Sequence, residues 1–349
     1  MLTGAGPVDP IIWKQDVLHL LDQRRLPAEE TYLTFTRASE VAHAISEMVV
    51  RGAPAIGITA AYAVVLSAAQ PHATRQSIDE DLQILAASRP TAVNLFWALD
   101  RMRKLLDGLL GSPPQWMDRL RAEALAIHDE DRRACLAMGN LGAAFLPTSA
   151  RVYTHCNAGA LATGGQGTSL SVVRQAYQSR QLLRTYVGET RPWMQGSRLT
   201  AWELMRDGIP VCVCTESAAA TLFRQRQVDW LIVGADRITR CGDVANKVGT
   251  YPLALLAKHH GVKVMVVAPI STIDATLLSG DEIPIEQRPD REVTHFGGRA
   301  LAPEGCEAFN PSFDVTPAAL IDVLVTERGV VQSPHERALL DLLASAPIL

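Results

Sequence analysis

Chemically active side chains follow several β-rich runs of the sequence, at the points where strands of a parallel sheet would end. Cys156 closes the run 151–156, Glu189 follows the run 183–187, and Asp236 follows the run 230–235. In an open parallel sheet, ligands bind beyond the carboxyl ends of the strands, because loops and helix N-termini gather there. We therefore expect a thiol and a carboxylate to converge on one edge, where they could move protons in a substrate.

These two side chains each have a structural alternative. Cys156 could be a small buried apolar residue, as most strand cysteines are, or a reactive thiol whose thiolate is favoured by His155 and by a following helix N-terminus. Asp236 could cap a helix after its strand, or it could act in catalysis. Residue types and spacing leave both alternatives open.

Two segments could bind an anion. The glycine-rich turn 158–169 predicts a loop that opens a helix and offers backbone N–H groups to a phosphate. Gly165 stands where a nucleotide P-loop needs lysine, and the dinucleotide pattern G-x-G-x-x-G is absent from the sequence. The second segment begins at Arg51, and Pro54 in it suits the first turn of a helix. Arg51 could point at a phosphate there, or it could simply be solvated.

The composition indicates a soluble globular protein. The 349 residues are 48% hydrophobic and 20% charged, with a net charge of −4, so nucleic acid is not an expected partner. The longest apolar run, 55–69, is shorter than the ~20 residues that span a bilayer, and it predicts a buried helix. The first residues do not resemble a secretion signal, which favours a cytoplasmic location. Six cysteines without a C-x-x-C pair predict neither disulfides nor a zinc site.

The pattern of apolar residues changes along the chain. From about residue 37 to 138 they recur every three or four positions, which predicts helices. Later, short β-rich runs at 151–156, 183–187, 210–214, 230–235 and 263–268 alternate with helical stretches, which predicts a mostly parallel sheet. The sequence therefore predicts an α/β protein with a mainly helical N-terminal domain, 1–125, and a Rossmann-like domain, 126–349. Segment 279–311 is rich in Pro, Gly and charge, and predicts a long loop or flap.

Six ordered motifs resemble the methylthioribose-1-phosphate isomerase family, over about residues 12–331. They are RGAPAIG (51–57), THCNAGALAT (154–163), ETRP (189–192), QG (195–196) with RLTAWE (198–203), GADR (234–237) and GDVANKVGTY (242–251). The family shares its fold with ribose-1,5-bisphosphate isomerases and with regulatory subunits of a translation-initiation exchange factor, and fold alone does not separate them. The intact THCNAG (154–159) and ANK (245–247) segments favour a catalyst.

The resemblance implies an isomerase that converts 5-methylthioribose 1-phosphate to 5-methylthioribulose 1-phosphate in methionine salvage. It implies no metal and no other cofactor, a small sugar phosphate as the partner molecule, and a homodimer. Cys156 and Asp236 are implied as the catalytic pair. The implied substrate contacts are Arg51, Gly52, Ala53, Arg89, Gln195, Asn246 and Lys247.

Two alternative functions accompany this one. The chain could isomerise another aldose 1-phosphate, such as ribose 1,5-bisphosphate or 5-deoxyribose 1-phosphate, or it could be a non-catalytic regulatory subunit that binds sugar phosphates. A 5-phosphate would need an extra cationic cluster, whereas a methylthio group would need an apolar or aromatic lining. Trp13, Trp193 and Met194 are candidates for that lining.

Overall fold

The N-terminal part combines a small sheet with five helices. The computed structural model describes residues 8–345. Strands β1 (Ile11–Lys14), β2 (Val17–Leu21) and β3 (Tyr32–Phe35) form an antiparallel sheet that the helical periodicity did not predict. The helices are α1 (Ala38–Ser46), α2 (Ala53–Ala68), α3 (Arg75–Ser88), α4 (Val93–Asp107) and α5 (Pro113–Ala143). The prediction of a mainly helical N-terminal region is confirmed.

Helix α2 lies at the centre of this part. Every residue of it except Pro54 is buried, which confirms the buried helix predicted for the apolar run. A helix that is apolar on all sides must be enclosed by protein, and α2 packs against α1, α3, α4 and α5. This packing fixes the position of its N-terminus, which follows Arg51 directly.

The C-terminal part is built on a seven-stranded sheet with the order β16-β15-β10-β7-β4-β5-β6. Its strands are β4 (Ala150–Thr154), β5 (Leu182–Gly188), β6 (Val211–Cys214), β7 (Trp230–Val233), β10 (Lys263–Val267), β15 (Val323–Thr326) and β16 (Gly329–Gln332). Neighbouring strands are parallel except β15 and β16. The five predicted strands are confirmed, and the six parallel strands have the order of a Rossmann-like sheet.

Helices cover both faces of this sheet. Residues of α5, of α6 (Ser169–Gln178) and of α7 (Ala201–Arg206) share one apolar core with the sheet. Residues of α8 (Ala219–Arg224), α9 (Thr250–His260) and α11 (Glu336–Ala344) share the other. Coverage on both faces is the arrangement expected for a parallel sheet.

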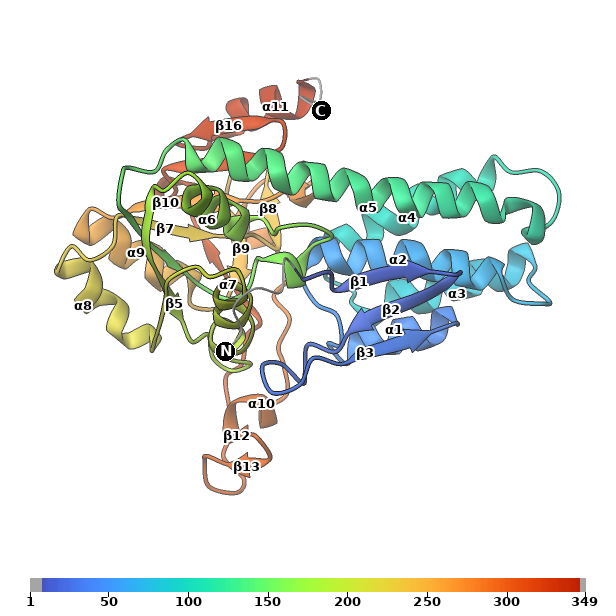
Figure 1. The fold of residues 1–349 in the computed structure, drawn as a ribbon, viewed down its shortest axis with the longest axis horizontal. Helices are drawn as coiled ribbons and strands as arrows, with labels where there is room; N and C mark the ends of the chain where they lie inside the picture. The colour runs from blue at the N-terminus through green and yellow to red at the C-terminus, as the bar shows by residue number, and fades with distance from the viewer. Residues whose placement is uncertain (1–7, 346–349) are drawn as a thin grey trace.

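Helix α5 links the two parts of the molecule. Trp116 and Leu120, near its start, belong to the core of the N-terminal helices, whereas Ala134 and Met138 belong to a core of the large sheet. Figure 1 shows this long helix running across both parts. The domain boundary predicted near residue 125 therefore falls inside a continuous helix.

A smaller sheet completes the C-terminal part, with the order β11-β8-β9-β14. Its strands are β8 (Arg237–Thr239), β9 (Val244–Lys247), β11 (Ile273–Asp274) and β14 (Phe313–Thr316). Segment 279–311 contains only one short 3-10 turn, helix α10 (Arg291–Thr294) and a hairpin of β12 (His295–Phe296) and β13 (Arg299–Ala300). The hairpin projects away from the rest of the chain (Figure 1). Within residues 8–345, no helix is long and apolar enough to cross a membrane.

Candidate active site

The predicted catalytic pair lies at the point where the strand order of the large sheet reverses. From β4 the chain continues to β5 and β6 on one side, and then returns to β7 on the other side of β4. Cys156 follows β4, and Asp236 follows β7. Crevices at such a reversal, beyond the carboxyl ends of the strands, are the usual ligand sites of open α/β sheets. Both residues line one hollow there, with Arg51 and Asn246.

The backbone of Cys156 is held in an uncommon conformation. Its φ is 61°, in the left-handed region that few residues other than glycine adopt. Its N–H donates to Thr190 Oγ1 at 2.8 Å, and its carbonyl accepts from Thr200 Oγ1 at 2.6 Å. The side chain is buried. Two threonine hydroxyls from other segments thus fix the direction in which the thiol projects, and such strained positions cluster at functional sites.

His155 does not supply the charge that the sequence led us to expect beside the thiol. The ring is buried, with Nε2 2.9 Å from the Val248 carbonyl and Nδ1 3.4 Å from Thr190 Oγ1. Burial lowers the pKa of His155 to about 4, so the ring is neutral at pH 7. The prediction that His155 favours the thiolate is therefore wrong. Cys156 instead lies close enough to Lys247 to affect the pKa of that ammonium group.

Asp236 is surrounded by protein, and three cations act on it. Its backbone N–H donates to Ala245 O at 2.9 Å, which joins the end of β7 to β9. No group in residues 8–345 donates a hydrogen bond to its carboxyl oxygens. Burial raises the pKa of this carboxyl, and the charges of Lys247, Arg51 and Arg89 offset part of that rise. A raised pKa keeps more of the acid form available at neutral pH, as a proton donor requires.

Lys247 and Asn246 are the last two residues of β9, a strand of the smaller sheet. Lys247 Nζ donates to Ser312 O at 2.9 Å and lies 5.0 Å from the centre of the Phe313 ring. Burial lowers the pKa of Lys247, while Cys156 and Asp236 act in the opposite direction. Asn246 Nδ2 donates to Thr250 Oγ1 at 3.0 Å. The predicted contact residues of β9 therefore lie beside the predicted catalytic pair.

Arg89 carries hydrogen-bond donors that the protein leaves without partners. Its Nε and Nη1 are buried and have no acceptor within residues 8–345. Its nearest carboxylate, Glu286, has Oε2 at 3.9 Å from Nη2, beyond hydrogen-bond distance. Arg89 and Asp236 line a second hollow, next to the first, together with Gly52 and Ala53. Buried donors without acceptors are costly, and an anion in this hollow would satisfy them.

The start of α2 supplies the other predicted anion contacts. Gly52 has φ of 94°, and a Cβ built on it would lie 2.4 Å from Ala162 Cβ, so only glycine fits there. Arg51 donates from Nη1 to Asn157 Oδ1 at 2.6 Å and from Nη2 to Asn157 O at 2.7 Å. These two bonds hold the Arg51 guanidinium, which belongs to the N-terminal part, against the loop that follows Cys156.

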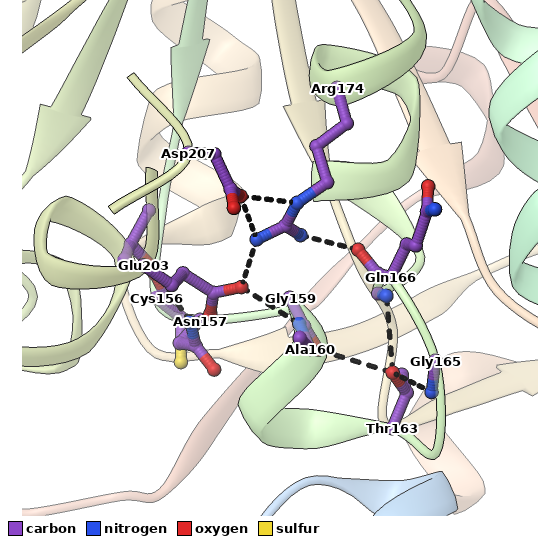
Figure 2. Close-up of polar contacts among 12 residues, drawn as sticks. Cys156, Asn157, Gly159, Ala160, Thr163, Gly165, Gln166, Arg174, Glu203 and Asp207 are labelled. Carbon is purple, nitrogen blue, oxygen red and sulfur yellow. Dashed lines mark hydrogen bonds and ion pairs between the residues drawn. The ribbon is translucent and has the colours of Figure 1, made fainter. Parts of the chain in front are cut away.

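A buried network holds that loop in place. Asn157 donates to Glu203, whose other oxygen accepts from the Ala160 N–H at 2.8 Å and from Arg174 Nη2 at 2.8 Å. Arg174 also donates to Asp207 Oδ2 at 2.7 Å. Figure 2 shows Arg174 lying between the two carboxylates and the glycine-rich turn. This network is not predictable from the sequence pattern, because the spacing of Glu203, Arg174 and Asp207 does not distinguish them from ordinary helix residues.

Four amides of the glycine-rich turn are bonded within the protein and are not free for the predicted anion. The N–H of Ala160 donates to Glu203, that of Gly164 to Asp131 Oδ2 at 2.7 Å, and those of Gly165 and Gly167 to Thr163 Oγ1. Amides already bonded to protein oxygens cannot also bind a phosphate. The glycines instead allow close packing, since a Cβ on Gly159 would lie 2.2 Å from the Glu203 carboxylate.

The remaining predicted residues divide between the site and the N-terminal core. Gln195 and Trp193 line a third hollow with Arg51, and Gln195 Oε1 is buried without a hydrogen-bond donor in the described part of the chain. Trp13 stacks on Tyr62 with ring centres 5.0 Å apart, within the core of the N-terminal helices. The proposal that Trp13 lines the substrate site is therefore wrong. The apolar residues beside Asp236 are Ile56, Ile283, Pro284 and Phe313.

Comparisons with known proteins agree with this arrangement. Residues 49–333 match the model of the Initiation factor 2 subunit family. Methylthioribose-1-phosphate isomerase of Pseudomonas aeruginosa (strain UCBPP-PA14) is 54% identical over 352 residues, covering 98% of each chain. The crystal structure of 5-methylthioribose 1-phosphate isomerase from Pyrococcus horikoshii OT3 aligns with a TM-score of 0.90 at 43% identity, covering 98% of this chain and 97% of that one.

A protein with a different name is nearly as similar. Subunit delta of the translation initiation factor eIF-2B from A. fulgidus aligns with a TM-score of 0.85 at 39% identity, over 97% of this chain and 100% of that one. The fold of this chain is therefore shared with that initiation factor subunit. The chain belongs to the initiation factor 2 subunit family and, within it, to the methylthioribose-1-phosphate isomerases.

Proposed function

We propose that the chain isomerises 5-methylthioribose 1-phosphate to 5-methylthioribulose 1-phosphate. The observation that carries this proposal is the 54% identity to an isomerase of that name over nearly the whole length of both chains. The geometry supports it, because a thiol, a carboxyl with a raised pKa and three cations surround adjoining hollows. Those groups suit the binding of a phosphate and the movement of protons on a sugar.

Asp236 is proposed as the acid that opens the sugar ring. The anomeric oxygen of an aldose 1-phosphate is esterified, so the ring cannot open by ordinary mutarotation and the enzyme must open it. Asp236, kept partly protonated by burial, gives its proton to the ring oxygen, and the resulting carboxylate acts as a base in a later step. Lys247, Arg51 and Arg89 hold the phosphate meanwhile, and such fixed cationic donors stabilise the charge that develops in the transition state.

Cys156 is proposed to act on hydrogen transfer between C2 and C1. In one route its thiolate removes the C2 proton, an enediolate-like phosphoenolate forms, and the Cys156 thiol then returns a proton to C1. In the other route a hydride moves from C2 to C1, and Cys156 positions the reacting carbons. Cys156→Ser is expected to lower kcat at least about 10²-fold, the usual contribution of a positioned base. A wild-type rate would restrict Cys156 to packing.

The hollow beside Asp236 offers Arg89 to the 1-phosphate and apolar side chains to the rest of the sugar, but no second set of free cations among the described residues for a 5-phosphate. Ile56, Ile283, Pro284 and Phe313 line this hollow, and its charged residues are Arg89, Asp236 and Arg237. Arg237 donates to Thr91 O at 3.1 Å and pairs with Asp274, so it is already engaged. A 5-phosphate would need further cations, whereas a thioether packs against aliphatic and aromatic side chains.

The regulatory-subunit alternative follows from the similarity to the initiation factor subunit. A subunit of that kind would bind sugar phosphates without converting them. We further propose that the enzyme acts in methionine salvage, as a homodimer, in the cytoplasm.

The test is phosphorus and carbon NMR of the purified chain in D₂O, with 5-methylthioribose 1-phosphate in one tube and ribose 1,5-bisphosphate in another. Formation of the ketose from the methylthio sugar alone is expected. Deuterium at C1 would indicate the proton-transfer route. Conversion of the bisphosphate alone would assign a different substrate, and conversion of neither sugar would support the regulatory-subunit alternative.

A further inference from the structure

One cavity in the described part of the chain is larger than the hollows of the candidate active site and is separate from them. It has a volume of about 480 Å³, within the range of small-molecule sites. It lies among α2, α4, α5 and the ends of β10 and β15. Its apolar walls include Ile58, Ile127 and Ala134, and Trp97 of α4 lines it as well. Such a cavity could hold a small organic molecule.

Two carboxyl groups that line this cavity make no ion pair with any residue in 8–345. Asp131 Oδ2 accepts from the Gly164 N–H, at 2.7 Å, and from the Cys135 thiol, and Glu327 Oε2 accepts from the Ile270 N–H at 2.9 Å. Burial raises the pKa of Asp131 to about 6 and also raises that of Glu327, while the more distant charges of Arg132 and Arg328 offset part of each rise. Carboxyls that no cation contacts directly are costly to ionise.

The arginines of the cavity are already engaged. Arg101 donates to Glu123 and, through both terminal nitrogens, to Glu130. Arg133 pairs with Asp129 at 3.0 Å, and Arg328 donates to the carbonyls of Leu343 and Ser345. The groups left for a ligand are therefore acceptors, which favours a cation over an anion.

A third acceptor in the wall is an amide. Asn94 is only 3% exposed, and its Nδ2 donates to Ser271 Oγ at 2.8 Å. Its Oδ1 accepts no hydrogen bond from any described residue. Both Asn94 and Ser271 line the cavity. An unpartnered buried acceptor costs stability unless a donor reaches it, so this wall also calls for a hydrogen-bond donor.

We propose that this cavity binds an aliphatic amine, with its ammonium group between Asp131, Glu327 and Asn94 and its hydrocarbon chain against Ile58 and Trp97. A metal ion fits less well, because residues 8–345 contain no group of three or more His, Cys, Asp or Glu side chains arranged to hold one. The apolar walls require a ligand with a hydrocarbon part.

This cavity adjoins the candidate active site through α2. Pro54, in the first turn of α2, lines both the cavity and the hollow that contains Cys156. Asn94 lies against the same helix, since a Cβ on Gly57 would be 2.7 Å from the Asn94 carbonyl. An occupant of the cavity would therefore contact the helix whose N-terminus follows Arg51.

The test is isothermal titration of the purified full chain with n-pentylamine at constant ionic strength, with 1-pentanol, inorganic phosphate and magnesium chloride as parallel probes. Saturable binding of the amine alone is expected. Glu327→Gln keeps an acceptor for the Ile270 N–H and should weaken amine binding about tenfold, as expected for loss of one charge-assisted hydrogen bond. Glu336→Gln, at an exposed glutamate outside the cavity, is the matched control and should leave binding unchanged.

Trp97→Ala provides a second variant that does not depend on the buried carboxyls, because Trp97 is 38% exposed. It should also weaken amine binding. The proposal is overturned if the amine does not bind the wild-type chain, if Glu327→Gln binds it as tightly, or if pentanol, phosphate or magnesium binds equally well. These measurements do not depend on isomerase activity, so failure of this proposal can be distinguished from failure of the proposed function.

Discussion

Replacing Asp236 by asparagine tests its proposed role in proton transfer. Asparagine has nearly the same shape but cannot exchange a proton near pH 7. A positioned general acid or base contributes about 10²–10⁴-fold, so kcat should fall at least about 10²-fold, or about 2.7 kcal/mol in barrier height. KM should stay the same or fall, because the substitution removes the negative charge that opposes Lys247, Arg51 and Arg89. Phosphorus NMR of turnover over a range of substrate concentrations measures both quantities.

The stability of the same variant separates this role from a structural one. Burial raises the pKa of Asp236 above 3.8 in the folded chain, so the folded state binds this proton more tightly than the unfolded state. The group therefore costs stability as pH rises above its unfolded pKa, and the full cost is present above its folded pKa. Asp236→Asn should have a Tm equal to or above that of the wild type at pH 8, with the difference shrinking toward pH 4. An unchanged Tm with less than a tenfold loss of kcat would refute the acid–base role.

Three further predictions concern the surroundings of the pair. Arg89→Ala should lower kcat/KM about 10- to 100-fold, mainly through KM, because the variant removes the unpartnered donors that would bind the phosphate. Steady-state kinetics at constant ionic strength measures this, and an unchanged KM would contradict it. Gly159→Ala should lower the free energy of unfolding in urea by at least about 1–3 kcal/mol, since the new Cβ would overlap the Glu203 carboxylate. Gly108→Ala is the control and should be nearly neutral, because its Cβ would lie 3.6 Å from the nearest atom, Leu105 O. His155 is neutral when folded and has a pKa lowered to about 4, so its own contribution to stability should fall by about 3 kcal/mol as pH drops from 6.5 to 4. Wild type should therefore lose that much more stability than His155→Gln over this pH range, and equal slopes for the two proteins would contradict this.

The elements around the site were largely predictable, but their order was not. The strands that end before Cys156 and Asp236 are short, β-rich runs bounded by turn residues, and the sequence alone identified them. That β4 and β7 are neighbours depends on how the crossover helices pack, which local periodicity does not encode. The resemblance to the isomerase family supplied Arg89, whose spacing in the sequence gives no sign of its place beside Asp236.

Features that depend on tertiary contacts were missed or mispredicted. The glycine-rich turn has the composition of an anion-binding loop, yet Glu203 and Asp131, distant in sequence, accept two of its N–H groups. His155 beside a cysteine suggests a charged partner, but complete burial makes the ring neutral. Local sequence shows which groups are available, whereas burial and distant partners decide what those groups do.

The two parts of the chain contribute different components of the proposed site. The N-terminal part supplies Arg51 and Arg89, and the C-terminal part supplies the proposed proton-transfer pair. Arg51 is fixed by two hydrogen bonds to Asn157, so the arginine is positioned only when the sheet is folded against α2. Because α5 contributes to the cores of both parts, a chain divided near residue 125 would disrupt both cores. The proposed site is therefore a property of the whole chain, and neither part would be expected to bind the sugar phosphate alone.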